Sequence, residues 1–248
     1  MNASPRIALV TGATRGIGLE TVRQLAEAGV HTLLAGRNRE RAVEAALTLQ
    51  AQGLPVEAIA LDVTDAASID AAVAEVERRH GRLDILVNNA GIVVDDAGRG
   101  VSGQSLDTWR ATFDTNVFGL IAVTQAFLPL LHKSSAGRIV NVSSALGSVT
   151  LHADPASFIY DFKIPAYNVS KSAVNAWTVQ LAYELKDSAI KVNTIHPGYV
   201  RTEMNHVDGE QRGELEVPDG ARTSVRLALI DDAGPNGGFF YLEESLPW

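Results

Sequence analysis

The sequence predicts an α/β fold, in which a doubly wound parallel sheet of six or seven strands, of the Rossmann type, carries helices on both faces. Three observations support this. Strand-like and helix-like segments alternate, the strand-like segments are apolar throughout, and a glycine-rich turn directly follows the first of them. Such strands are typical of parallel sheets buried on both faces. Right-handed connections between them place a ligand crevice at the carboxyl ends of the strands.

The first two strand–helix pairs surround the glycine-rich turn. Residues 7–10 form a short apolar run that predicts a strand, and apolar residues after the turn recur at helical spacing up to Gly29. A second strand is predicted over residues 32–35. The helix that follows, over residues 39–52, carries its apolar residues on one side.

The later segments continue the alternation. One helix is expected to begin near Asp65, because aspartate caps helix amino termini. The further predicted strands lie at 56–61, 85–87, 138–142, 191–195 and 237–241, and the further predicted helices at 66–79, 106–131 and 166–185. No repeat or interdomain linker interrupts them, so one domain over residues 1–248 is expected.

Composition narrows the class of protein. The chain has 248 residues, of which 46% are hydrophobic, enough for one well-buried core. Its net charge is −8 and it has no Lys/Arg-rich run, which argues against nucleic acid or a polybasic membrane contact as partner. It has no Cys, no apolar signal core near its start and no apolar stretch of about 18 residues. We expect a soluble cytoplasmic protein.

A tyrosine and a lysine in the predicted helix over residues 166–185 indicate a catalytic site. Tyr167 and Lys171 are four residues apart, so both side chains lie on one face of that helix. A free phenol has a pKa of about 10, and a neighbouring ammonium favours its ionised form. The pair therefore predicts an acid–base tyrosine. The alternative is a packed tyrosine with a lysine that reaches water.

The glycine-rich turn predicts a nucleotide site. Gly12 allows a sharp turn after the strand, Gly16 leaves room for a pyrophosphate, and Gly18 lets the helix pack closely. The helix amino terminus then offers free N–H groups and a partial positive charge to the phosphates. A merely tight strand–helix turn is the alternative.

The end of the second strand predicts which nicotinamide binds. NAD requires an acidic residue there for its ribose hydroxyl, but this chain has no carboxylate until Glu40. Arg37 is instead suited to a 2′-phosphate, and Arg15 in the glycine-rich turn is expected on the same side. NADP is therefore the expected cofactor, unless both arginines are only solvated surface residues.

From Ile7 to Thr202 the chain resembles the compact, single-domain short-chain dehydrogenases/reductases. The resemblance rests on seven motifs in family order: Thr11–Gly18, Asp62-Val63, Asn88–Gly91, Asn116, Ser144, Tyr167–Lys171, and Pro197-Gly198 with Thr202. It implies that the cofactor contacts are Gly12, Thr14, Arg15, Gly16, Ile17, Gly18, Arg37, Asp62, Val63, Asn89, Ala90, Gly91, Tyr167, Lys171, Pro197, Gly198, Val200 and Thr202.

The resemblance also implies four catalytic residues. Tyr167 would exchange the proton with the substrate oxygen, and Lys171 would hold the nicotinamide ribose and lower the phenol's pKa. Ser144 would hydrogen-bond the carbonyl oxygen. Asn116 would hold a water that links Lys171 to solvent. Ser143 is a competing candidate for the serine, but Ser144 has the family spacing to the following glycine.

Three segments are expected to form substrate loops, at residues 92–104, 147–165 and 199–217. The stretch between Ser144 and Tyr167 is about ten residues longer than in compact members, and a loop this long is usually functional. Its apolar residues are candidates for a substrate wall, or else they simply pad the surface or fold into a short helix. Because the insertion resembles carbonyl reductases, several of which are monomeric, we favour a monomer, with a homo-oligomer as the alternative.

The expected function is NADPH-dependent reduction of a ketone or aldehyde to an alcohol, with a small-molecule carbonyl or alcohol as substrate. The alternatives are an oxidative dehydrogenase of a hydroxylated metabolite and a non-catalytic NADP-binding redox sensor. No metal site is expected, because the six histidines have no ligand-like spacing.

Overall fold

The computed structural model describes residues 5–96, 98–207 and 210–248. Its main sheet has eight strands in the order β10–β9–β6–β5–β4–β1–β2–β3. The strands are β1 (Ile7–Val10), β2 (His31–Gly36), β3 (Val56–Ala60), β4 (Ile85–Asn88), β5 (Arg138–Val142), β6 (Lys191–Ile195), β9 (Phe239–Tyr241) and β10 (Glu244–Ser245). Seven of them are parallel, which confirms the predicted doubly wound sheet. Only β10 was not expected, and it pairs antiparallel with β9.

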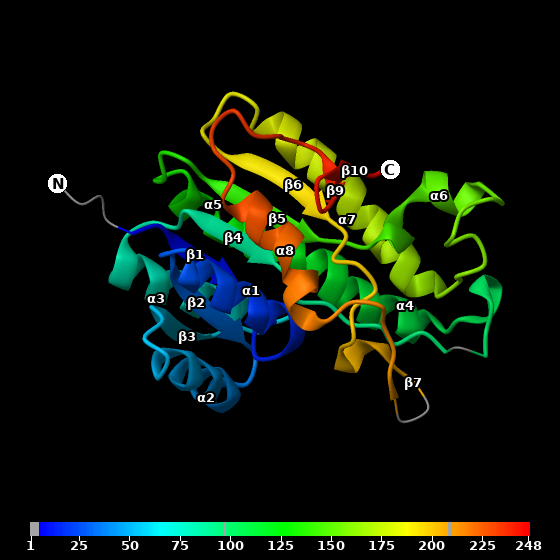
Figure 1. Ribbon diagram of the computed structural model, residues 1–248, viewed down its shortest axis with the longest axis horizontal. Helices are drawn as coiled ribbons and strands as arrows, with labels where there is room; N and C mark the ends of the chain where they lie inside the picture. The colour runs from blue at the N-terminus through cyan, green and yellow to red at the C-terminus, as the bar shows by residue number, and fades with distance from the viewer. Residues whose placement is uncertain (1–4, 97, 208–209) are drawn as a thin grey trace.

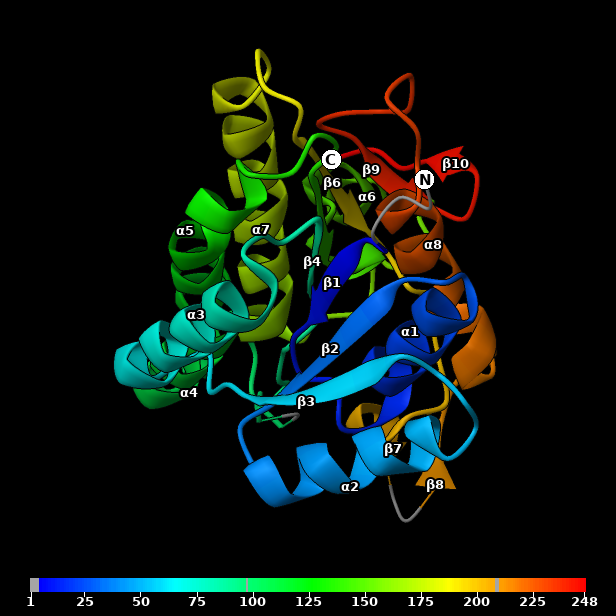
Figure 2. The same ribbon diagram turned by 90° about the vertical axis from the view of Figure 1, so that its left-hand side faces the viewer.

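Helices cover both faces of this sheet (Figures 1 and 2). They are α1 (Gly16–Glu27), α2 (Arg39–Gln50), α3 (Ala66–His80), α4 (Leu106–Phe113), α5 (Leu120–Leu131), α6 (Val149–Ala153), α7 (Pro165–Glu184) and α8 (Val217–Ala228). Short 3₁₀ turns are η1 (Val101–Gly103), η3 (Ala145–Gly147) and η4 (Glu203–Asn205). A separate ribbon pairs β7 (His206–Val207) with β8 (Glu210–Gln211).

Two apolar clusters lie on opposite faces of the same sheet. One packs α3, α5 and α7 against it, with Phe127 of α5 fully buried. The other packs α1, α2 and α8 against it, with Leu25 of α1 fully buried. Figure 2 shows the two sets of helices on either side of the strands. The strands are apolar along their length because both of their faces are covered.

The predicted helix over residues 106–131 is not uniform. A π-helical segment, η2 (Asp114–Gly119), separates α4 from α5. Glycine is required at its end, since a Cβ on Gly119 would lie 2.8 Å from the carbonyl oxygen of Val63. By length and composition the whole stretch Leu106–Leu131 could cross a membrane, contrary to the sequence expectation. Half of its most apolar window is buried in the molecule, as in the core helices of soluble proteins, which pass the same test.

One helix escaped prediction, α8, and another, α6, was expected only as an alternative for its loop. The short α6 lies in the loop between Ser144 and Tyr167, and α8 follows the 199–217 segment. The sequence of α8 contains Gly220, Thr223 and Ser224, residue types with weak helix propensity. All three are buried, so α8 is stabilised by packing and not by its own propensity.

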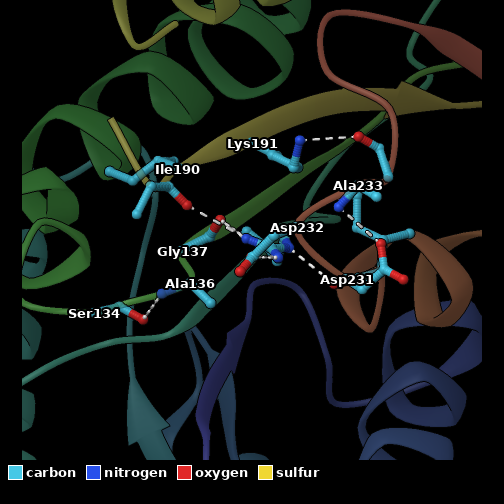
Figure 3. A network of polar contacts seen from close by, with 12 residues as sticks. Ser134, Ala136, Gly137, Ile190, Lys191, Asp231, Asp232 and Ala233 are labelled. Carbon is cyan, nitrogen blue, oxygen red and sulfur yellow. Dashed lines mark hydrogen bonds and ion pairs between the residues drawn. The ribbon is translucent and has the colours of Figure 1, made fainter. Parts of the chain in front are cut away.

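A buried guanidinium ties the amino end of β5 to two distant segments. The side chain of Arg138 is only 2% exposed and donates to the carbonyl oxygens of Ile230, Gly137 and Ala189. It also forms an ion pair with Asp232 at 2.8 Å. Figure 3 shows this network, with Gly137 and Lys191 at the starts of β5 and β6 facing Asp231, Asp232 and Ala233 of the segment that follows α8. These bonds satisfy the buried charge at the amino end of β5, a strand in the middle of the sheet.

Candidate active site

The glycine-rich turn after β1 is fastened to the segment after β4. The hydroxyl oxygen of Thr11 accepts from the backbone N–H groups of Asn89 and Ala90, each at 3.0 Å. The Asn89 amide donates back to the carbonyl oxygens of Thr11 and Gly12. Gly12 has φ +62°, and a Cβ there would lie 2.8 Å from the Cα of Ala90. The two predicted motifs therefore form one unit.

The first turn of α1 is open to an anion. The helix begins at Gly16, its N-cap residue Arg15 makes no side-chain capping bond, and the first turn contains no acidic residue. Its N–H groups are therefore left without a side-chain partner within the helix cap, and the helix dipole adds a partial positive charge. A Cβ on Gly16 would meet only the Thr202 methyl, at 3.7 Å. This arrangement fits a phosphate group.

A cleft of about 460 Å³ lies over this turn, at the carboxyl ends of the strands. Of the predicted cofactor contacts it is lined by Gly12, Thr14, Arg15, Gly16, Ile17, Gly18, Arg37, Asp62, Val63, Asn89, Ala90, Gly91 and Thr202. Its other walls include Thr115, Arg201, Glu203 and Met204. Predicted contacts from five regions of the chain thus meet at one crevice, at the place where the sequence predicts it.

The remaining predicted contacts lie beside the cleft. Gly198 has φ +90°, and a Cβ there would lie 2.4 Å from a methyl of Leu215. It follows Pro197 at the turn after β6. Val200 is buried and packs against Gly220 of α8, where a Cβ would lie 2.6 Å from Val200 Cγ2. These residues hold the 199–217 segment near the cleft, although they do not line it.

The end of the cleft where the adenine is predicted to bind is lined by Arg15, Arg37 and Asp62. Arg37 directly follows β2 and is exposed. Asp62 accepts from the backbone N–H and the hydroxyl of Thr64, at 2.9 and 2.7 Å. The backbone hydrogen bond from Thr64 is the largest cause that lowers the pKa of Asp62, and Arg37 adds to it. Arg15 is ion-paired with Glu203 of η4, so a phosphate that recruits Arg15 has to displace Glu203.

Tyr167 and Lys171 are both buried on α7, and the Lys171 Nζ lies 5.5 Å from the centre of the Tyr167 ring. The Tyr167 hydroxyl is hydrogen-bonded to Ser144, whose side chain also accepts from the backbone N–H of Leu146. The Lys171 Nζ donates to the carbonyl oxygen of Val142 at 2.7 Å. The structure therefore brings the predicted serine, tyrosine and lysine together. Ser143 is directed elsewhere, and its hydroxyl donates to the carbonyl oxygen of Lys171 at 3.2 Å.

The electrostatics of the pair differ from the sequence expectation. Burial raises the pKa of Tyr167 to about 12, and the hydrogen bond to Ser144 only partly opposes this. Burial lowers the pKa of Lys171 to about 8. We expected the lysine to depress the phenol's pKa, but desolvation dominates for both groups. At neutral pH the phenol is therefore protonated, and the neighbouring Lys171 ammonium is a stronger acid than that of a free lysine.

Asn116 lies in the π-helical segment η2 and is fully buried. Its Oδ1 accepts from the backbone N–H of Ile92 at 2.8 Å, and its amide donates to the Ile92 carbonyl oxygen and to the Ser170 hydroxyl. A Cβ on Gly91 would lie 3.4 Å from this Oδ1 and 3.6 Å from the Lys171 Nζ. Asn116 and Lys171 thus meet at the same glycine. The predicted water between them stays a prediction.

Asp95 is a residue that the sequence analysis missed. Its carboxylate accepts from the backbone N–H groups of Ala166 and Tyr167, at 2.7 and 3.1 Å. The helix α7 has no side-chain cap from its own N-cap residue, so Asp95 caps it from the loop over residues 92–104. Asp95 is about 70 residues away from the helix that it caps, so local sequence patterns do not reveal this role. The one sign of it in the sequence is an acidic residue soon after the Asn88–Gly91 motif.

The loop over residues 147–165 is less closely connected with the cleft. Phe158 and Phe162 are exposed, Ile159 is buried, and none of the three lines the cleft. The His152 ring hydrogen-bonds the carbonyl oxygen of Leu146, and the other ring nitrogen lies 3.0 Å from the Lys163 Nζ. The substrate wall expected here therefore stays a prediction.

Comparisons with known proteins agree with this geometry. A model of the short chain dehydrogenase family matches residues 6–213. A (+)-neomenthol dehydrogenase from Arabidopsis thaliana is 36% identical, over 96% of this chain and 96% of the relative. A (−)-isopiperitenone reductase from Mentha piperita is 34% identical, over 97% of this chain and 98% of the relative. The NADPH-bound carbonyl reductase from chicken fatty liver superposes with a TM-score of 0.84 and 28% identity, over 99% of this chain and all of that one.

The buried lysine generates a prediction about stability. Below pH 8 both the folded and the unfolded chain hold the Lys171 proton, and the folded state carries the cost of a buried charge. Lys171→Met removes that cost, so the variant should be more stable than the wild type at pH 7, by about 1–3 kcal/mol after loss of the bond to Val142. Between pH 8 and about 10.4 the folded wild type releases the proton first, so its stability rises and the difference shrinks.

Urea denaturation of both proteins at pH 7 and pH 9.5 measures this difference. Lys186→Met is the matched control, because Lys186 is half-exposed and pairs with Asp187 at the surface. A Lys171→Met protein that is less stable than the wild type at pH 7 would contradict the prediction.

Proposed function

The chain belongs to the short-chain dehydrogenase family, and from this we propose that it reduces a ketone or aldehyde to an alcohol with NADPH as the reductant. The proposal is supported by the contacts of Tyr167 with Ser144 and Lys171, and by the Lys171 Nζ lying next to Gly91, which lines the glycine-rich cleft. The names of the relatives support a reductase acting on a small molecule.

The cleft fits a phosphorylated dinucleotide. The uncapped first turn of α1 would hold the pyrophosphate, and Asp62 and Val63 would contact the adenine. Arg37 would bind the 2′-phosphate, since no carboxylate at the end of β2 opposes it. Lys171 would hold the nicotinamide ribose, and Thr202 the carboxamide. When bound, NADPH supplies the hydride.

The residues of this chain would supply the proton and the charge stabilisation. Ser144 donates a hydrogen bond to the carbonyl oxygen and stabilises the negative charge that develops on it. Tyr167 donates its proton to the same oxygen. Burial keeps the phenol protonated at neutral pH, as a proton donor must be, and Tyr167 would act as the acid in reduction and as the base in the reverse reaction.

The substrate is proposed to have an apolar body, in line with the apolar residues of the 147–165 loop. Loss of chemistry, as in an NADP-binding sensor, is disfavoured by the intact set of Asn116, Ser144, Tyr167 and Lys171. The preference for a monomer and the cytoplasmic location stay predictions.

Removal of the phenolic hydroxyl tests the proton donor. Tyr167→Phe should lower turnover by about 10²- to 10⁴-fold, because the alkoxide then lacks its acid. NADPH binding, followed by cofactor fluorescence, should be retained. Tyr183→Phe serves as the control, since Tyr183 is on the same helix but is 71% exposed. Tyr167→Phe protein with wild-type turnover would end this mechanism.

Cofactor choice depends on Arg37. Arg37→Ala should raise the KM for NADPH by about 10- to 100-fold, the loss of one charge-assisted contact, and leave the KM for NADH nearly unchanged. Arg41→Ala is the matched control, because Arg41 is exposed on α2 and does not line the cleft. A wild-type preference for NADH would refute the assignment of NADP.

The cap that Asp95 forms on α7 is expected to keep Tyr167 in position. Asp95→Ala should lower kcat by about 10- to 100-fold through misplacement of Tyr167, with NADPH affinity unchanged. Asp95→Asn keeps one acceptor and should recover part of that loss. The neighbouring Asp96→Ala is the control, since Asp96 pairs with Arg99 in the loop. Equal kcat values for Asp95→Ala and Asp96→Ala would show that the cap is not needed.

A further inference from the structure

Two histidines and a glutamate converge at the far edge of the sheet. His31 begins β2, Glu57 is the second residue of the neighbouring β3, and His80 ends α3. The register pairs Thr32 with Val56, so His31 and Glu57 lie at the amino ends of adjacent strands. The cleft lies at the carboxyl ends. This cluster is therefore separate from the candidate active site.

The three side chains are arranged as metal ligands are. One ligand atom from each residue lies within 4.8 Å of the other two. His31 Nε2 is 2.8 Å from Glu57 Oε1, and His80 Nε2 is 3.6 Å from Glu57 Oε2. The centres of the two imidazole rings are 5.1 Å apart. Ligands of a tetrahedral ion bound at about 2.0–2.2 Å lie between about 3 and 4 Å from one another, so small side-chain movements are sufficient.

The surroundings of His80 are not explained by an ion pair within the protein. Its Nε2 is buried, and it finds no hydrogen-bond partner in the described part of the chain. The distance to Glu57 Oε2 is too long for a hydrogen bond. Burial lowers the pKa of His80 below its ordinary value. A buried, unpartnered ring nitrogen beside a carboxylate is costly unless a ligand satisfies it.

Glu57 is the anionic member of the cluster. Burial would raise the pKa of Glu57, but its hydrogen bond to Arg79 and the nearby His31 bring it below the ordinary value. Arg79 is the natural competitor for this carboxylate, with Nη1 2.9 Å from Glu57 Oε2. The same guanidinium also pairs with Glu75, four residues earlier on α3, at 2.5 Å. Arg79 therefore keeps Glu75 as an ionic partner when Glu57 binds a metal ion instead.

We propose that His31, Glu57 and His80 form a binding site for a divalent transition-metal ion of the zinc type, with water in the fourth position. Two imidazoles and one carboxylate are a ligand set that zinc accepts, and imidazole excludes calcium and magnesium as preferred ions. The ion joins β2, the edge strand β3 and the carboxyl end of α3. Its effect is on stability, since β3 has a partner on one side only.

Zinc binding by the purified full chain tests the proposal. Competition with a chromophoric chelator should give one equivalent of bound zinc for the wild type. At a free zinc concentration 100-fold above its dissociation constant, the melting temperature should rise by about 5 °C or more. His31→Gln and His80→Gln should each lose the equivalent and the rise in melting temperature. His132→Gln is the matched control, because His132 is exposed elsewhere on the surface and should bind as the wild type does.

Arg79→Ala distinguishes this site from adventitious surface binding. Loss of the competing guanidinium should strengthen zinc binding, because Glu57 is then free to act as a ligand. Weaker binding in Arg79→Ala, no zinc equivalent in the wild type, or equal binding in all histidine variants would each overturn the proposal. None of these measurements uses NADPH or a carbonyl substrate, so their outcome is independent of the proposed function.

Discussion

Burial of the Lys171 ammonium beside the Tyr167 phenol is the constraint on which the site depends. A buried charge needs a partner, and the carbonyl oxygen at the end of β5 provides it at 2.7 Å. The close packing also needs a glycine. A Cβ on Gly147 would lie 2.8 Å from the backbone carbonyl carbon of Lys171, whereas one on Gly91 would reach only ordinary contact with its Nζ, at 3.6 Å. The loops around α7 are therefore shaped by the lysine that they enclose.

Sequence patterns predicted the sheet because its strands are apolar on both faces and its turns carry glycine. Family motifs that keep their order along the chain also predicted a site, and the structure brings many of its residues to one cleft. They missed contacts that depend on distance in space: the cap that Asp95 places on α7, the helix α8 that packing stabilises, and the meeting of His31 with His80. The expected direction of the Tyr167 pKa was wrong for the same reason, since desolvation depends on the surroundings and not on i, i+4 spacing.

The two ends of the sheet have different tasks in this account. At the carboxyl ends, glycines line the cleft that we propose for the nucleotide, and the Arg15–Glu203 pair joins the glycine-rich turn to the 199–217 segment. At the amino ends lie two polar clusters, one around Arg138, the first residue of β5, and one formed by the histidines beside β3. The polar clusters therefore lie at the opposite ends of the strands from the proposed active site.

The most direct test of the central claim is isotope transfer. NADPH carrying deuterium on the transferable position of its nicotinamide is incubated with the wild-type protein and a panel of apolar ketones and aldehydes, and the alcohols formed are analysed by mass spectrometry. The account predicts an alcohol that carries one deuterium on the former carbonyl carbon, formed by the wild type and not by Tyr167→Phe. Alcohol without deuterium, or no oxidation of NADPH with any carbonyl in the panel, would contradict it.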